Sequence, residues 1–296
     1  MNLAFTEEYG IYRILMCKDC RLSFTDPMQA GDRTFYKGCI VYERTDSVTI
    51  SEHSRSAAKK SNRRLLGLIP KEGRVLDIGC GLGVFVKYAL EQGYDAYGVD
   101  FNDEHIHLGQ KVLGLGERLI LGDVKDLHNR NCFSKSFDLI TLFEVIEHVE
   151  DPGQLIKSTY KMLSKGGLLA ISCPNEARWQ PTGRVFADYP PHHLTRWRPD
   201  TLRSFLGNHG FEHIKTELDC RFSNLIWVAY VNRSAKRKQA QSAPDDGCEK
   251  VAGSVNLRRL KRTVFSLIRL LSMPLDLVLK AAGIGTLGMR MVVKKA

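Results

Sequence analysis

Short apolar runs alternate with amphipathic stretches along residues 74–219, and this alternation limits the fold more than any other feature of the sequence. Short apolar runs are typical of buried strands, and apolar residues at helical spacing are typical of helices that lie on a sheet. A chain that repeats strand and helix forms right-handed crossovers and a mostly parallel sheet covered on both faces. We therefore predict a doubly wound α/β domain. The predicted strands cover residues 75–78, 96–99, 119–121, 137–142, 168–172 and 211–218, and the predicted helices cover 84–92, 103–113, 154–163 and 199–210.

Three glycines follow the first predicted strand at every second position, in the run DIGCGLG. They are Gly79, Gly81 and Gly83, and they fall at the carboxyl end of the strand, where doubly wound sheets bind their ligands. A dinucleotide-binding fingerprint needs glycines in the pattern GxGxxG. Val84 or Val86 stands in the place of the third glycine, depending on the register. The run therefore does not match the pattern of NAD-binding proteins.

The acid before the glycines indicates the charge of the ligand. Asp77 lies two residues before Gly79, and a carboxylate repels a pyrophosphate but attracts an ammonium or sulfonium group. Glycines let a ligand approach the backbone closely, and we expect the N–H groups of this loop to point outward at the start of the helix. These features predict a nucleoside ligand with a cationic tail, of which S-adenosyl-L-methionine is the common biological example.

The run from Asp77 to Gly83 resembles motif I of the class I S-adenosylmethionine-dependent methyltransferases. In the later motifs of that family, Asp100 matches the acid that holds the ribose hydroxyls, and residues 122–124 match the turn that faces the adenine. The run FEVIEHV at 143–149 is similar to the ubiquinone-biosynthesis O-methyltransferases. The resemblance implies a Rossmann-like sheet of seven strands with S-adenosyl-L-methionine as cofactor. It implies the cofactor-binding residues Asp77, Gly79, Cys80, Gly81, Gly83, Asp100, Phe101, Asp123, Val124, Phe143 and Glu144.

The character of the sequence changes along the chain and divides it into parts. We expect Gly166 and Gly167 to end the helix before the fifth strand, and Pro274 to break a C-terminal amphipathic helix. That helical part is predicted to be an insertion before the last strand of the sheet. The predicted parts are an N-terminal extension (1–50), a methyltransferase domain (51–230), a basic linker with amphipathic helices (231–285) and a closing strand (286–296).

Two acids and a histidine follow the fourth predicted strand: Glu144, Glu147 and His148. In the similar O-methyltransferases the matching ExxEH run is associated with a divalent cation, so metal-assisted deprotonation of a phenol is one alternative. The other is that Glu144 and His148, four residues apart, pair within one helical turn. We favour the pair, as a wall on the cofactor side, and expect no bound metal.

The segment YPPHHLTRW at 189–197 follows the fifth predicted strand. Its prolines stiffen a loop, and in relatives with a similar run the loop closes over the acceptor pocket. His193 matches the histidine of that run, and a neutral imidazole with a pKa of about 6.5 can accept a proton. We therefore predict His193 and His148 as catalytic residues. His192 is expected to hold the loop shut and Trp197 to stack on a flat acceptor, and the alternative is a solvent-exposed histidine pair.

One C-x-x-C pair, Cys17 and Cys20, lies near the N-terminus. It resembles the second half of a zinc ribbon that precedes the methyltransferase domain in some relatives. A structural zinc site needs four ligands, and the first half of that pattern is absent from the chain. We expect a relic hairpin with reduced thiols and no zinc.

The positive charge is confined to one end of the chain. The formal net charge is +10, and residues 231–296 contain 14 Lys or Arg and 4 Asp or Glu, so the rest is balanced. This balance makes a nucleic-acid partner unlikely for the main body. Residues 255–282 combine apolar residues at helical spacing with basic ones, as in helices that lie at a bilayer interface. We predict peripheral membrane contact there, and the alternative is a helix packed on the domain.

Three functions are compatible with these patterns. The first is methyl transfer to a small or lipid-like acceptor, most simply at oxygen. The second is an RNA or protein methyltransferase anchored by the basic tail; the run FEVI at 143–146, in place of an Asn-Pro-Pro-Tyr type motif, argues against base N-methylation. The third is a non-catalytic module that binds the cofactor. The sequence shows no signal peptide and no apolar run of about 18 residues, so we expect a cytoplasmic protein, with or without membrane association.

Overall fold

The computed structural model describes most of the chain, and all structural statements below refer to these residues. Among the predicted features, Val124 and half of the helix expected at 255–282 lie outside them. The described residues are 2–31, 35, 60–123, 136–181, 183–184, 188–241, 268 and 270–296.

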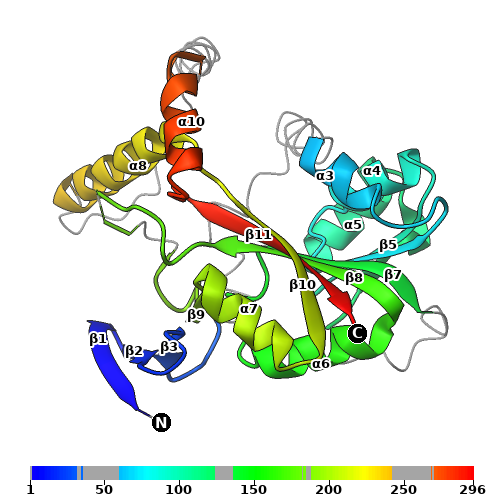
Figure 1. Cartoon of the computed structure of the whole chain (residues 1–296), viewed down its shortest axis with the longest axis horizontal. Helices are drawn as coiled ribbons and strands as arrows, with labels where there is room; N and C mark the ends of the chain where they lie inside the picture. The colour runs from blue at the N-terminus through cyan, green and yellow to red at the C-terminus, as the bar shows by residue number, and fades with distance from the viewer. Residues whose placement is uncertain are drawn as a thin grey trace.

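A seven-stranded sheet forms the centre of the molecule, as the sequence predicts (Figure 1). The strand order is β10-β11-β8-β7-β4-β5-β6. All ladders between neighbours are parallel except those of β11, which runs antiparallel to β8 and β10. The strands are β4 (Arg74–Ile78), β5 (Asp95–Asp100), β6 (Leu119–Leu121), β7 (Phe137–Phe143), β8 (Leu163–Pro174), β10 (Phe211–Leu218) and β11 (Gly288–Lys295).

Helices cover both faces of this sheet (Figure 1). On one face α3, α4 and α5 bury side chains such as Leu66, Phe85 and Ile106 against Val75 and Leu139. On the other face α6 and α7 complete a second apolar core. The helices are α3 (Lys60–Leu66), α4 (Val84–Glu91), α5 (Asp103–Val112), the 3₁₀ turn η1 (Gly116–Arg118), α6 (Pro152–Met162) and α7 (Pro199–Gly207).

The local sequence explains where α6 begins but not where it ends. The Asp151 side chain accepts a hydrogen bond from the Gln154 N–H, and proline occupies the first turn, where its missing N–H costs nothing. The prediction that Gly166 and Gly167 end this helix is wrong. The helix ends at Met162, because the chain from Leu163 onward already pairs with β7, and both glycines lie inside the long strand β8.

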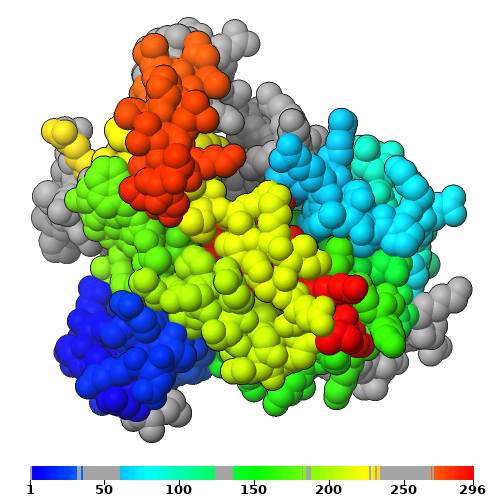
Figure 2. Space-filling model, in the orientation of Figure 1, coloured from blue at the N-terminus to red at the C-terminus, as the bar shows by residue number. Residues whose placement is uncertain are grey.

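The N-terminal extension forms a small antiparallel sheet with the loop that follows β8. The strands β1 (Leu3–Tyr9), β2 (Tyr12–Cys17) and β3 (Ser23–Asp26) are joined by β9 (Thr195–Arg196). The Tyr9 ring also stacks on Tyr189 at a centroid distance of 4.7 Å. In the space-filling view this sheet is a dark blue lobe beside the green and yellow-green body of the molecule (Figure 2). The extension thus holds the loop that contains the predicted catalytic histidine.

Two helices precede the closing strand, so the predicted helical insertion is confirmed. They are α8 (Phe222–Gln241) and α10 (Met273–Ala281), and both stand at the same end of the sheet (Figure 1). Pro274 lies in the first turn of α10, where a proline fits. In the described part of the chain, no helix is long and apolar enough to cross a membrane.

Candidate active site

The glycine loop leaves β4 with its glycines in the left-handed region. The φ angles of Gly79, Gly81 and Gly83 are 73°, 52° and 75°. A Cβ on Gly79 would lie 2.4 Å from Cγ2 of Val145, so a side chain does not fit there. A Cβ on Gly81 would have no heavy atom within 4 Å. Gly79 therefore serves close packing of the protein, whereas Gly81 leaves an open side where a ligand can approach the backbone.

The first three amides of this loop are bound to β5. The N–H groups of Gly79 and Cys80 donate to the Val99 carbonyl at 2.8 and 3.1 Å. The Gly81 N–H donates to Oδ2 of Asp100 at 2.8 Å. The expectation of outward N–H groups is wrong for these three residues, because the end of β5 satisfies them first. The loop can therefore contribute the open space at Gly81 and the carboxylates beside it to ligand binding.

Two of these carboxylates lie near each other, the buried Asp77 and the half-buried Asp100. Oδ1 of Asp77 accepts a hydrogen bond from the Thr141 hydroxyl at 2.6 Å. Burial raises the pKa of Asp77 to about 7; the hydrogen bond from Thr141 opposes this, and the Asp100 charge adds to it. Burial likewise raises the pKa of Asp100, against hydrogen bonds from the Asn102 and Gly81 amides. A positive tail on the ligand would stabilise both carboxylates in their charged form, whereas a pyrophosphate would not. The residues therefore fit S-adenosyl-L-methionine better than a pyrophosphate.

The other predicted cofactor residues lie around the same edge. Phe101 follows β5 and is 43% exposed. Phe143 ends β7 and packs edge-on against Phe85 at 5.2 Å between ring centroids. Asp123 follows β6, at the far end of the strand order. Apart from Val124, which is outside the described residues, all predicted cofactor positions lie at or just beyond the carboxyl ends of β4, β5, β6 and β7.

Glu144 turns away from His148. Glu144 follows β7 with a left-handed backbone, at a φ of 56°. Its N–H donates to the Ser172 carbonyl at 2.9 Å, and its Oε1 accepts from the Ser172 hydroxyl at 2.7 Å. The predicted pair between Glu144 and His148 is therefore wrong, because residues 144–149 form turns in which no helical face brings them together. Burial, together with the Glu144 charge, raises the pKa of Glu147 well above its usual value.

His148, His192 and His193 meet instead. Nδ1 of His148 lies 2.6 Å from the His192 carbonyl oxygen, and the three rings are in edge or tilted contact. Burial, and then the other two imidazoles, lower the pKa of His148 to about 3, so the ring is neutral and Nδ1 donates to the carbonyl. This contact helps to tie the loop to the turn after β7, together with the Leu194 and Thr195 amides, which donate to the Glu147 carbonyl. His192 and His193 are 8% and 7% exposed, which excludes the alternative of a solvent-exposed pair.

Among the described residues, these histidines are the one group that could hold a metal ion. One ring nitrogen from each lies within 4.8 Å of the others. Ligands of a tetrahedral zinc site lie about 3.3 Å apart, given bonds of about 2.0 Å, so the cluster would have to contract to bind one. The absence of a bound metal stays a prediction.

His193 also faces a carboxylate. Its Nδ1 lies 3.7 Å from Oδ1 of Asp188, which forms a buried ion pair with Arg178. The expectation that Trp197 stacks on an acceptor is wrong. That ring is 1% exposed, and its Nε1 donates to the Thr195 hydroxyl at 2.9 Å, so it belongs to the core.

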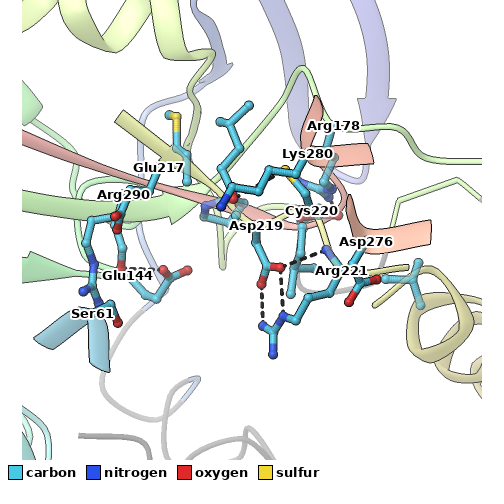
Figure 3. A pocket seen from close by; sticks show the side chains of 18 of the residues that line it. Ser61, Glu144, Arg178, Glu217, Asp219, Cys220, Arg221, Asp276, Lys280 and Arg290 are labelled. Carbon is cyan, nitrogen blue, oxygen red and sulfur yellow. Dashed lines mark hydrogen bonds and ion pairs between the residues drawn. The ribbon is translucent and has the colours of Figure 1, made fainter. Parts of the chain in front are cut away.

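A cavity of about 920 Å³ opens between the ends of β8, β10 and β11 and the helices α8 and α10 (Figure 3). It connects Glu144, beside the glycine loop, with His193 in the loop after β8. The sequence analysis missed Ser172 and Arg290 in its wall. Arg290 had one signal, because it interrupts an otherwise apolar predicted strand, GMRMVV. Further lining residues are Arg178, Asp188, Glu217, Asp219, Arg221, Asp276 and Lys280.

The C-x-x-C pair forms a tight turn after β2, far from the glycine loop in the chain's fold (Figure 1). Backbone N–H groups of Cys20 and Asp19 bind the Cys17 sulfur and lower the pKa of its thiol. Both cysteines are free. No third histidine, cysteine or acid joins them within the described residues to form a ligand group.

Comparison with known proteins assigns the family. Residues 50–216 match the model of a methyltransferase domain. Ubiquinone biosynthesis O-methyltransferases are 30% identical over 155 residues in Caulobacter sp. (strain K31) and 32% identical over 144 residues in Bartonella tribocorum. Each alignment covers 47% of this chain and 60% and 55% of the relative, so the match spans less than two thirds of their length.

The fold has a counterpart among solved structures. A SAM-dependent methyltransferase from Archaeoglobus fulgidus aligns with a TM-score of 0.50 and 19% identity, covering 89% of this chain and 100% of that chain. Such a likeness shows the fold alone. The chain belongs to the methyltransferase domain family, with S-adenosyl-L-methionine as its cofactor.

Proposed function

We propose that this chain transfers a methyl group from S-adenosyl-L-methionine to an oxygen of a small or lipid-like acceptor. The observation that carries the proposal is the cavity that begins at Glu144, next to the predicted cofactor residues, and reaches the buried His193. A cavity at this edge of a doubly wound sheet is where an acceptor can meet the cofactor. The bound cofactor supplies an already activated methyl group.

The protein's main task in such a transfer is to hold the acceptor in line and to exclude water, which contributes several kcal/mol through effective molarity. The second task is to remove a proton when the nucleophile is a hydroxyl. His193 lines the cavity, which supports this role. The Asp188 carboxylate, 3.7 Å from Nδ1, favours the tautomer with its proton on Nδ1 and leaves Nε2 as the acceptor. His148 is assigned to positioning, because it contacts His193 and the His192 carbonyl.

Oxygen is preferred as the methylated atom because of the relatives. Their names state O-methylation in ubiquinone biosynthesis, and the FEVIEHV run lies in the matched region. The alternatives are a methyltransferase acting on RNA or protein and a module that binds the cofactor without turnover. The cavity favours a small acceptor over RNA, since nucleic acids are bound on basic surface patches.

Peripheral membrane contact is the second part of the proposal. In α10 apolar side chains face solvent: Leu277 is 69% and Val278 64% exposed, and Leu271 just before the helix is 78% exposed. Together with the basic residues at 258–262, this exposed apolar surface supports docking at an anionic bilayer. A lipid-like acceptor would then reach the cavity, which α10 lines with Asp276 and Lys280.

Incubation of the pure protein with S-adenosyl-L-methionine labelled at the methyl group, together with an extract of its own cells, tests the proposal. We expect label in a small-molecule fraction, extractable into solvent, and a product that resists mild base, as ethers do. Label in the RNA or protein fraction would support the macromolecular alternative. Absence of any transfer, in spite of cofactor binding, would support the non-catalytic module.

A further inference from the structure

Some of the charged residues that line the cavity form ion pairs, and others do not. Asp188 pairs with Arg178, and Asp219 pairs with Arg221. Among the described lining residues, Lys280 and Arg290 are the cations for which no ion pair is formed. Lys280 is exposed, so water solvates its ammonium group. Arg290 is different because its guanidinium is largely withdrawn from solvent.

Arg290 is fixed by the sheet and by an aromatic ring. It lies on β11 between Ser172 of β8 and Glu217 of β10 in the ladder registers. Its guanidinium carbon lies 4.7 Å from the centroid of the Phe143 ring. Nη1 is buried and makes no hydrogen bond to any described residue. Leaving a buried guanidinium N–H without an acceptor costs more than a typical hydrogen bond contributes, so the position favours an incoming acceptor group.

The two acids whose charges act on Arg290, Glu144 and Glu217, are bound to other side chains. Glu144 accepts the Ser172 hydroxyl at 2.7 Å, and Glu217 pairs with Lys215 at 2.6 Å. Both influence Arg290 electrostatically, but neither forms an ion pair with it among the described residues. Figure 3 shows Arg290 and Glu144 at one end of the cavity, with Asp219, Arg221 and Asp276 at the other. The guanidinium of Arg290 therefore lies at the end of the cavity nearest the predicted cofactor site.

We propose that Arg290 binds a carboxylate on the methyl acceptor, which makes the acceptor an organic acid that also carries the methylated group. The proposal rests on the proposed methyl transfer and specifies its substrate class. A planar guanidinium matches a carboxylate in a two-point contact. A phosphate is disfavoured because its second negative charge would be repelled by Glu144 and Glu217.

A matched pair of probes tests this assignment: 3,4-dihydroxybenzoate and its neutral amide, 3,4-dihydroxybenzamide. Each is titrated by NMR into the full chain saturated with S-adenosylhomocysteine. The variants are Arg290→Met, which removes the charge, and Arg290→Lys, which keeps it without the planar fork. Arg203→Met on the exposed side of α7 is the control for a general loss of positive charge. S-adenosylhomocysteine affinity is measured for each protein by calorimetry.

We expect the wild type to bind the acid about tenfold or more tightly than the amide, the effect of a charge-assisted hydrogen bond. Arg290→Met should equalise the two affinities with the amide unchanged, Arg290→Lys should keep part of the preference, and Arg203→Met should keep all of it. No preference in the wild type, no binding of either probe, or a preference that survives in Arg290→Met overturns the proposal. Loss of S-adenosylhomocysteine affinity in Arg290→Met would assign the guanidinium to the cofactor's carboxylate. Failure of the proposed methyl transfer would appear separately, as no transfer of label from S-adenosyl-L-methionine to any fraction of the cell extract.

Discussion

Asp77→Asn is expected to stabilise the cofactor-free protein and to weaken cofactor binding. The carboxyl of Asp77 is buried, and its pKa rises from 3.8 to about 7 on folding. The folded state therefore holds a proton that the unfolded state has lost, and the free energy of unfolding falls as the pH rises between these two values. An amide at this position does not titrate, and its oxygen can still accept the hydrogen bond that the Thr141 hydroxyl donates.

The size of the effect follows from the two pKa values. A group with a pKa of 3.8 unfolded and about 7 folded lowers the free energy of unfolding by about 2 kcal/mol more at pH 8 than at pH 5.5. The stability of Asp77→Asn relative to the wild type should increase by this amount over that interval. The same carboxylate is the predicted partner of the cofactor's cationic tail, so the affinity for S-adenosyl-L-methionine at pH 8 should fall about tenfold or more.

Urea denaturation of the cofactor-free proteins at pH 5.5 and pH 8 measures the first effect, and calorimetric titration at pH 8 measures the second. Asp95→Asn is a matched control. Burial of Asp95 is outweighed by hydrogen bonds from Arg118 and Arg74, which lower its pKa, so it stays ionised in both states over this pH interval. Its stability difference from the wild type should not change with pH. A pH-independent difference for Asp77→Asn, or an unchanged affinity, would refute the reasoning.

Four further changes test other parts of the protein. Gly81→Val should abolish binding of S-adenosylhomocysteine in calorimetry, because the side chain would fill the open side of the loop. The protein should still unfold cooperatively, because no heavy atom lies within 4 Å and a φ of 52° costs only about 1–2 kcal/mol. Retained binding would contradict the role of that open side. His193→Ala should lower turnover about a hundredfold with unchanged cofactor affinity, as expected for loss of a base, and full activity on a hydroxyl acceptor at neutral pH would exclude that role. His148→Ala should reduce both turnover and cofactor affinity. Deletion of residues 239–285 should abolish flotation with vesicles of acidic lipids, and equal flotation of both proteins would assign the helix to the domain.

The periodic parts of the sequence predicted their structure well. The strand expected at 211–218 is β10 with the same bounds, and the helix expected at 103–113 is α5 to within one residue. Asn102 caps the first turn of α5, and Gly210 immediately precedes β10, so local chemistry decides where these segments begin. Gly166 and Gly167 were placed wrongly for the opposite reason. Pairing of β8 with β7 overrides the tendency of glycine to end a helix, and a single sequence does not show that pairing.

The site was predictable where one motif contains it and not where distant segments build it. Asp77, Gly81 and Asp100 lie within two βα turns, and the structure brings them together as expected. The partner of His148 was not predictable, since helical spacing suggested Glu144 and the turn after β7 sends that side chain to Ser172. Arg290 reaches the cavity only because the last strand inserts beside β8, which is a property of the topology.

The central claim is that the glycine loop and its two carboxylates bind S-adenosyl-L-methionine and not a dinucleotide. Calorimetric titration of the full chain with S-adenosylhomocysteine and, separately, with NAD tests it most directly. The account predicts saturable 1:1 binding of S-adenosylhomocysteine and no measurable heat with NAD at the same concentrations. Binding of NAD without binding of S-adenosylhomocysteine would contradict it.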